Sequence, residues 1–216
     1  PYFDPMLAKV IVHADDRAAA INGLDRALAD TCLEGIETNA QYVREILYSD
    51  VMQRGGMYTR FLNGFKYSPA TLDVLVPGTM TSVQDFPGRT GYWHIGVPPS
   101  GPFDSLSFRL GNRLLGNDEN AAGLEITLNG PTLRFNCDTH IALTGATMAA
   151  TLDGAALKPW QSHAVKAGQT LTLGKVQAAG ARAYLCVAGG FQCEHYLGSK
   201  STFTLGQFGG HGGRAL

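Results

Sequence analysis

The chain has 216 residues, of which 44% are hydrophobic and 16% charged, and its 17 Lys and Arg nearly balance 18 Asp and Glu. This composition is typical of one or two globular domains, and the net charge of −1 gives no sign of a face for nucleic acid or an anionic membrane. The absence of an apolar stretch of about 18 residues and of a signal pattern argues against a membrane-spanning or secreted protein. Because the first residue is Pro1 and not Met, we expect a piece of a longer protein.

The first third of the chain predicts one strand followed by helices. The short apolar run Leu7–His13 favours a strand. Asp15 or Asp16 can cap a first helix, Thr38-Asn39 marks the start of a second, and a shorter helix after Thr59 should end near residue 64. Such a small unit cannot hold a full core, so apolar residues in it should be unusually exposed. The apolar positions of the strand and the two longer helices are Leu7, Ile11, Ile21, Leu24, Leu28, Tyr42, Val43, Ile46 and Leu47.

The remainder of the chain is turn-rich. Residues 71–216 contain 22 of the 27 glycines, and Pro-Gly, Asn-Gly and Asp-Gly pairs separate short β-type runs. One helix interrupts them: Asp104 is its N-cap, and apolar residues at positions 103, 106, 110 and 114 line one face. The pattern predicts an α+β, mostly β chain, with a barrel or sandwich closed by a helix. The predicted strands are Leu72–Val76, Trp93–Val97, Leu124–Leu128, Thr132–Phe135, Ile141–Thr144, Thr170–Leu173 and Ala183–Val187.

Cysteines and histidines give no metal signature. Cys32, Cys137, Cys186 and Cys193 lack CxxC spacing, and the six histidines are scattered singly. We therefore expect free thiols in a reducing cytoplasm and no metal site. The glycine-rich stretch 208–214 lacks the Lys-Ser/Thr pair of a phosphate-binding loop.

The densest polar segment runs from Thr81 to Asp104. Rigid loops of this kind suit a small polar ligand, but Asp104 can equally serve only as a helix cap, and Arg89 can pair locally with Asp85. Glu125 alternates with apolar neighbours in its strand, so it lies either in an enclosed polar site or in solvent. The pattern alone leaves both alternatives open.

Two sets of motifs resemble a known family. The run Tyr2–Ile11 and the motif Gly35-Ile36-Glu37-Thr38-Asn39 resemble the end of the biotin carboxylase domain of biotin-dependent carboxylases. Residues 72–216 are similar to the first half of the carboxyltransferase domain of urea carboxylases. The stretches that carry the second resemblance are Gln84–Arg89, Gly96–Asp104, Leu124–Pro131 and Leu197–Thr202, with Lys200 where the family usually has Arg.

This resemblance implies three parts: residues 1–67 as the end of a biotin carboxylase domain, 68–71 as a linker, and 72–216 as a cyclophilin-like β-barrel. It implies an enzyme that uses ATP, Mg²⁺, bicarbonate and biotin to carboxylate urea to allophanate, by way of carboxybiotin. The ATP and biotin sites would lie in missing parts of the parent, against which this piece would pack, so the piece alone should be inactive and bind no cofactor or metal. Two rivals are an amide or lactam hydrolase component of the 5-oxoprolinase type and a regulatory protein that resembles antagonists of sensor-kinase inhibitors.

Urea offers one carbonyl acceptor and four N–H donors, so its site needs both acceptors and donors in a rigid frame. On that chemistry we predict Asp104 and Glu125 as catalytic acceptors or proton carriers. Arg89, Asn129 and Ser100 are the predicted substrate-binding residues.

Overall fold

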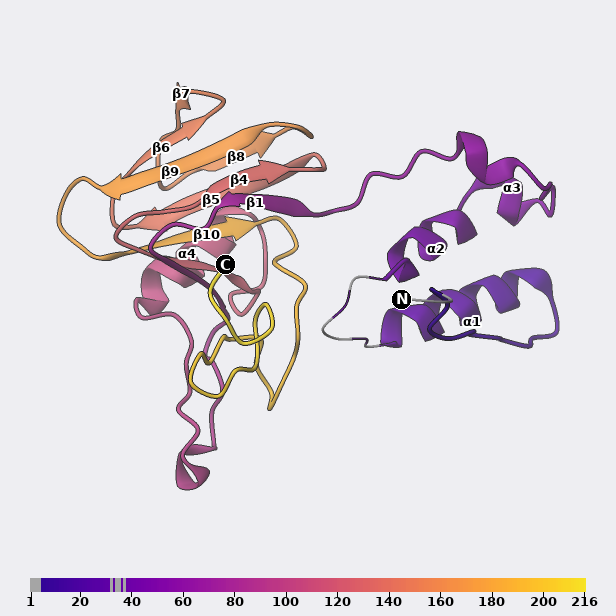
Figure 1. The fold of residues 1–216 in the computed structure, drawn as a ribbon, viewed down its shortest axis with the longest axis horizontal. Coiled ribbons are helices and arrows are strands. Elements are labelled where there is room, and N and C mark those ends of the chain that lie inside the picture. Colours follow the sequence, from indigo (N-terminus) through magenta and orange to yellow (C-terminus); the bar gives the residue numbers. More distant parts are fainter. Residues whose placement is uncertain (1–4, 32, 34–35, 37) are drawn as a thin grey trace. The chain divides into compact units, whose positions relative to one another are not determined.

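The computed structural model describes residues 5–31, 33, 36 and 38–216, which form two compact units, Pro1–Pro69 and Ala70–Leu216 (Figure 1). We call them unit 1 and unit 2. Cys32, Gly35, Glu37 and the first residues of the Tyr2–Ile11 motif lie outside the described residues.

Unit 1 is built from short helices, as predicted. The structure confirms the first helix as α1 (Arg17–Asp30), where the Asp16 side chain accepts a hydrogen bond from the Ala19 amide. The second is α2 (Ala40–Leu47), and the short one is a 3-10 helix, η1 (Phe61–Gly64). A further turn of helix, α3 (Asp50–Gln53), was not predicted, although Ser49 caps it through its hydroxyl.

The strand predicted at Leu7–His13 is wrong. The segment has no regular secondary structure, because a strand needs a neighbouring backbone and the described part of unit 1 contains no other strand. A Cβ at Gly23 in α1 would lie 2.9 Å from the Val12 side chain, so glycine makes room for this segment beside the helix. Leu7 and Ile11 are 63% and 87% exposed, in line with the expected incomplete core.

Unit 2 consists of two antiparallel five-stranded sheets and one α-helix, which confirms the α+β, mostly β prediction. One sheet has the order β1-β4-β9-β6-β7 and the other the order β2-β3-β10-β5-β8. Across the described strands, the pairings form these two sheets and no single closed ring. The strands are β1 (Leu72–Val76), β2 (Met80–Gln84), β3 (Gly123–Thr127), β4 (Thr132–Phe135), β5 (Thr139–Gly145), β6 (Met148–Leu152), β7 (Ala155–Ala156), β8 (Ser162–Val165), β9 (Thr170–Val176) and β10 (Arg182–Val187).

Apolar residues from both sheets form the core of unit 2. In strands β3 and β10 every second side chain faces the core. Leu124 and Ile126 of β3 lie there together with Ala183 and Leu185 of β10. The intervening residues Glu125 and Tyr184 therefore project from the other face of the sheet.

The strand predicted at Trp93–Val97 is also wrong. Residues Trp93–Ile95 form a 3-10 turn, η2, and the amide of Val97 returns to the carbonyl of Tyr92 at 3.2 Å. Gly96 follows η2 at a φ of 82°, which ends any extended run. Apolar composition alone could not separate a tight turn from a strand here.

Helix α4 (Ser105–Leu114) covers the outer face of the sheet that contains β5 and β10 (Figure 1). It approaches closely because Gly111 has no side chain: a Cβ there would lie 3.0 Å from Cys186 Sγ and 3.0 Å from Thr144 Oγ1. Phe108 is fully buried beside Gly111, and the Thr144 hydroxyl donates to the Ser107 carbonyl at 2.8 Å. The helix thus buries small and polar residues against the sheet.

We predict that Gly111→Val lowers the free energy of unfolding of unit 2 by about 1–3 kcal/mol, because the added methyl groups overpack the contact between α4 and the sheet. Guanidinium unfolding of the 216-residue chain measures the effect. Leu110→Val on the exposed side of the same helix is the matched control and should change the free energy of unfolding by about 0.5 kcal/mol or less. Equal losses for the two variants would contradict the close-approach argument.

Candidate functional site

A carboxylate on the outer face of the sheet is the centre of a polar cluster in unit 2. Glu125 lies in β3, opposite Ser82 of β2 and Tyr184 of β10. Its side chain is 13% exposed, so it is neither in the core nor freely solvated. The sequence left these two alternatives open, and the structure places Glu125 in a half-enclosed polar site.

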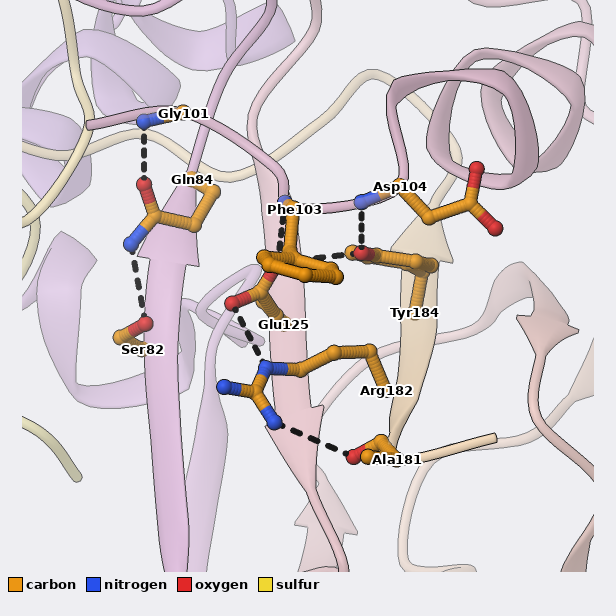
Figure 2. Close-up of polar contacts among 9 residues, drawn as sticks. All are labelled: Ser82, Gln84, Gly101, Phe103, Asp104, Glu125, Ala181, Arg182 and Tyr184. Atoms are coloured by element: carbon orange, nitrogen blue, oxygen red, sulfur yellow. Dashed lines mark hydrogen bonds and ion pairs between the residues drawn. The ribbon is translucent and has the colours of Figure 1, made fainter. Parts of the chain in front are cut away.

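Three donors converge on this carboxylate (Figure 2). Oε2 accepts hydrogen bonds from the Phe103 amide at 2.7 Å and from the Tyr184 hydroxyl at 3.0 Å. Oε1 faces Nε of Arg182 at 3.4 Å in an ion pair. These contacts fix the orientation of Glu125 and leave Oε1 with only a long contact.

Tyr184 connects the carboxylate to the start of α4. Its hydroxyl accepts a hydrogen bond from the Asp104 amide at 2.7 Å and donates to Glu125 (Figure 2). The side chain is fully buried, with the Phe108 ring edge-on at 5.7 Å. Burial raises the pKa of Tyr184 well above its ordinary value, so the hydroxyl stays protonated and remains a donor at neutral pH.

Arg182 supplies the positive charge of the site. Its guanidinium lies over the Phe103 ring at 5.5 Å, and its Nη1 donates to the Ala181 carbonyl at 3.4 Å. Its Nε is buried and makes no hydrogen bond in the described structure, so the contact with Glu125 is electrostatic.

Asp104 points its carboxylate away from Glu125 (Figure 2). One oxygen accepts from the Ser107 amide at 3.1 Å and the other from the Ser107 hydroxyl at 2.5 Å, which is the geometry of a helix N-cap. The Ser107 hydroxyl, followed by the Ser107 amide, lowers the pKa of Asp104 below its ordinary value. The catalytic role predicted for Asp104 remains untested, but its side chain is occupied by α4.

The predicted binding residues make other contacts. Arg89 is fully buried, and its guanidinium donates to the carbonyls of Tyr196 at 2.9 Å and Ser201 at 2.8 Å. Burial lowers the pKa of Arg89. Asn129 forms a β-bridge with Lys175 of the other sheet. The backbone of Ser100 has a φ of 56°. The amide of the next residue, Gly101, donates a hydrogen bond to the Gln84 side chain. Among the predicted site residues, the hydrogen bonds described above connect Glu125 only with the backbone of Asp104, by way of the Tyr184 hydroxyl.

Asp85 forms a second polar cluster, with the loop of residues 199–201. It accepts from the hydroxyls of Ser199 at 2.5 Å and Ser201 at 2.6 Å, and from the Lys200 amide at 2.8 Å. The Lys200 ammonium group donates to the side-chain oxygen of Gln192 at 3.2 Å and to the Phe191 carbonyl at 3.4 Å. The cluster holds the chain in place, and the Lys in place of the family's Arg makes no bidentate contact in it.

Arg182 and Tyr184 were missed by the sequence analysis. The signal was present: Tyr184 alternates with the apolar residues Ala183 and Leu185 in the run predicted only as a strand, and Arg182 directly precedes that run. That alternation puts them on the face that carries Glu125. The amide donor from Phe103 had no sequence signal, because a backbone contact depends on the path of the loop.

Other classes of site find no support in the described residues. No three His, Cys, Asp or Glu side chains there are grouped so that they could hold a metal ion. In the same residues no helix has the length and apolar character needed to span a bilayer. Cys137, Cys186 and Cys193 are free thiols.

Comparison with known families agrees with this division into a helical first unit and a β-rich second unit. The chain belongs to the family described as carboxyltransferase domain, subdomain A and B, whose sequence model matches residues 95–216. The model of the biotin carboxylase C-terminal domain matches residues 1–64.

Individual relatives show which enzymes of this family the chain resembles most strongly over its length. The chain is 49% identical over 216 residues to the urea amidolyase of Saccharomyces cerevisiae, a match that covers 100% of this chain and 12% of that protein. The crystal structure of the Kluyveromyces lactis urea carboxylase aligns with a TM-score of 0.84 at 49% identity, over 95% of this chain and 18% of that one. A 5-oxoprolinase component of Escherichia coli is 43% identical over 145 residues, which are 67% of this chain and 46% of that protein. The chain thus spans about an eighth of the urea amidolyase that it matches.

We predict that Asp104→Ala lowers the free energy of unfolding of unit 2 by about 1 kcal/mol and that Asp104→Asn changes it much less, because Asn also caps helices. The pKa of Asp104 is lowered by folding, so its charged form stabilises the fold above the ordinary value of 3.8. That contribution is lost as the pH falls through 3.8 toward the lowered value. Thermal unfolding of the 216-residue chain between neutral and acidic pH measures both effects; an Asp104→Ala penalty that stays constant into acid would contradict the assignment.

Proposed function

We propose that this chain is the part of a urea carboxylase that joins the end of the biotin carboxylase domain to the start of the carboxyltransferase domain. The proposed boundaries are residues 1–67, a linker at 68–71, and residues 72–216. The whole enzyme would use ATP, bicarbonate and biotin to carboxylate urea to allophanate. The observation that carries the proposal is one continuous match, through both units, to urea amidolyase.

This continuity also favours urea carboxylase over the two rivals. The 5-oxoprolinase component resembles only 145 residues of the chain, whereas the biotin carboxylase C-terminal domain matches residues 1–64. A lactam hydrolase component or a regulatory protein would leave the latter match unexplained. We further propose that unit 2 is a cyclophilin-like barrel, supported by two antiparallel sheets that share one core, and that the parent enzyme is cytoplasmic, supported by free thiols.

We propose that the cofactors of the whole enzyme bind outside the described residues. No group of metal-binding side chains there suits Mg²⁺, and the glycine-rich stretch 208–214 lacks a phosphate-binding Lys-Ser/Thr pair. We assign ATP, Mg²⁺ and biotin to the much longer remainder of the parent and derive no step through them.

For urea itself, we propose the cluster around Glu125 as one wall of the binding site. Oε1 of Glu125 would accept an N–H of urea, while the Arg182 guanidinium would donate to the urea carbonyl. When the urea nitrogen is carboxylated, Glu125 would hold the proton that this nitrogen gives up. Tyr184 and the Phe103 amide would keep the carboxylate in place. The remaining sequence predictions, untested by this geometry, are Arg89, Asn129, Ser100 and the side chain of Asp104.

We predict that Glu125→Gln in the full-length enzyme lowers urea-dependent ATP turnover by about 10²–10⁴-fold, because the amide cannot take up a proton. Urea-independent carboxylation of biotin, measured in parallel, should be unchanged. The matched control is Glu119→Gln, which removes a carboxylate paired with Arg109 and Arg113 in the same unit and should leave urea turnover intact. Normal urea turnover in Glu125→Gln would show that the urea site lies elsewhere.

A second prediction concerns the chain by itself. The 216-residue chain should show no biotin-dependent ATP hydrolysis, because its described residues offer no grouped metal ligands. A phosphate-release assay with biotin and bicarbonate measures this, with the full-length enzyme as positive control. Turnover by the short chain would overturn the assignment of ATP to the remainder of the parent.

A further inference from the structure

Two polar side chains of strand β2 lie on the same face of the sheet as the Glu125 carboxylate. Val83 of this strand points into the core, so its neighbours Ser82 and Gln84 project from the outer face. Ser82 is directly opposite Glu125 in the pairing of β2 with β3. The Cβ atoms of such opposite residues are about 5 Å apart. The Ser82 hydroxyl is therefore a close neighbour of the carboxylate (Figure 2).

The orientation of the Gln84 amide is fixed by its two partners. Its Oε1 accepts a hydrogen bond from the Gly101 amide at 2.9 Å, and its Nε2 donates to the Ser82 hydroxyl oxygen at 3.0 Å (Figure 2). A backbone amide can only donate, so the oxygen of Gln84 has to face Gly101 and the nitrogen has to face Ser82. The side chain is 7% exposed and packed in this position.

This arrangement determines what the Ser82 hydroxyl can do. Because its oxygen accepts from Gln84, its own proton must point elsewhere, and no acceptor among the described residues receives it. Ser82 is 8% exposed, and a hydroxyl at such a position costs free energy unless its proton finds an acceptor. On the neighbouring strand, Oε1 of Glu125 has only its 3.4 Å contact with Arg182. An unused donor and an under-used acceptor thus lie side by side on one face.

We propose that Ser82 is a further substrate-binding residue, whose hydroxyl donates to the urea carbonyl while Oε1 of Glu125 accepts an N–H of the same molecule. Gln84 is the positioning residue that directs the Ser82 proton toward the ligand. This inference rests on the proposed function, because its ligand is the urea assigned to the Glu125 cluster. A carbonyl oxygen has two lone pairs, so it can accept from Ser82 and Arg182 together. The pair selects a carbonyl that carries an N–H group, as ureas and primary amides do.

Gln84 also has a second effect on the carboxylate. The Gly101 amide that it binds lies two residues before Phe103, whose own amide donates to Glu125 at 2.7 Å. Removing the Gln84 side chain would therefore release this loop as well as the Ser82 hydroxyl. An isosteric change that keeps only the contact with Gly101 separates the two effects.

Steady-state kinetics of the full-length enzyme with urea as the varied substrate test the proposal. Ser82→Ala should raise KM for urea about 2–10-fold, the effect of one neutral hydrogen bond, and change kcat by about twofold or less. Gln84→Glu should raise KM equally, because its carboxylate still accepts from Gly101 but now also accepts the Ser82 proton. Gln84→Leu loses the contact with Gly101 too and should lower kcat in addition.

Two further variants are measured in parallel. Ser162→Ala removes an exposed hydroxyl from β8 of the same sheet and should keep the KM and kcat of the unmodified enzyme. An unchanged KM in Ser82→Ala would overturn the role of Ser82, and an unchanged KM in Gln84→Glu would overturn that of Gln84. Glu125→Gln distinguishes these failures from a failure of the proposed function. If it loses urea turnover while Ser82→Ala keeps its KM, only the further inference is wrong; if it keeps normal turnover, both are wrong.

Discussion

The close approach of α4 to the sheet is the constraint on which the site and the surface of unit 2 depend. Gly111 permits the contact, and Phe108 fills the space beside it. With the helix held there, its first residues lie over β3 and β10, and the amides at 103 and 104 reach Glu125 and Tyr184. The same contact fixes the rotation of the helix and so forces its leucines outward. One packing contact thus places the polar cluster and leaves Leu106 and Leu110 exposed on the other side of the helix.

Much of the fold could be predicted because turn pairs and helix-capping residues mark the ends of many elements in this chain. Short β-type runs between Pro-Gly, Asn-Gly and Asp-Gly turns located β1, β3, β4, β5, β9 and β10. Capping residues located α1, through Asp15 or Asp16, and α4, through Asp104. The strand predictions failed where the secondary structure of a segment depends on its contacts with other backbone segments. Leu7–His13 lacks a partner strand in the described residues, and Trp93–Ile95 closes on itself between glycines. Composition carries no information about either condition.

The candidate site could be predicted only in part, for the same reason. Glu125 was identified because a carboxylate among apolar neighbours is unusual, yet its surroundings depend on which residues of β10 lie opposite. Arg89 was predicted as a ligand donor because a charge in a Pro-Gly loop suggests a binding site. The structure uses its guanidinium to hold two backbone carbonyls, those of Tyr196 and Ser201. Buried polar groups must find partners, and the nearest partners are often the protein's own backbone.

Tyr184 shows how the polar cluster and the helix depend on each other. A buried hydroxyl costs free energy unless it both donates and accepts, and here the two partners come from different elements. The Asp104 amide belongs to the helix start, so a shift of α4 breaks its bond to Tyr184, whereas the bond from Tyr184 to Glu125 lies within the sheet. The Phe103 amide, which also precedes the helix, donates directly to Glu125. The start of α4 therefore controls two of the hydrogen bonds that surround the carboxylate, one made directly to it and one made through Tyr184.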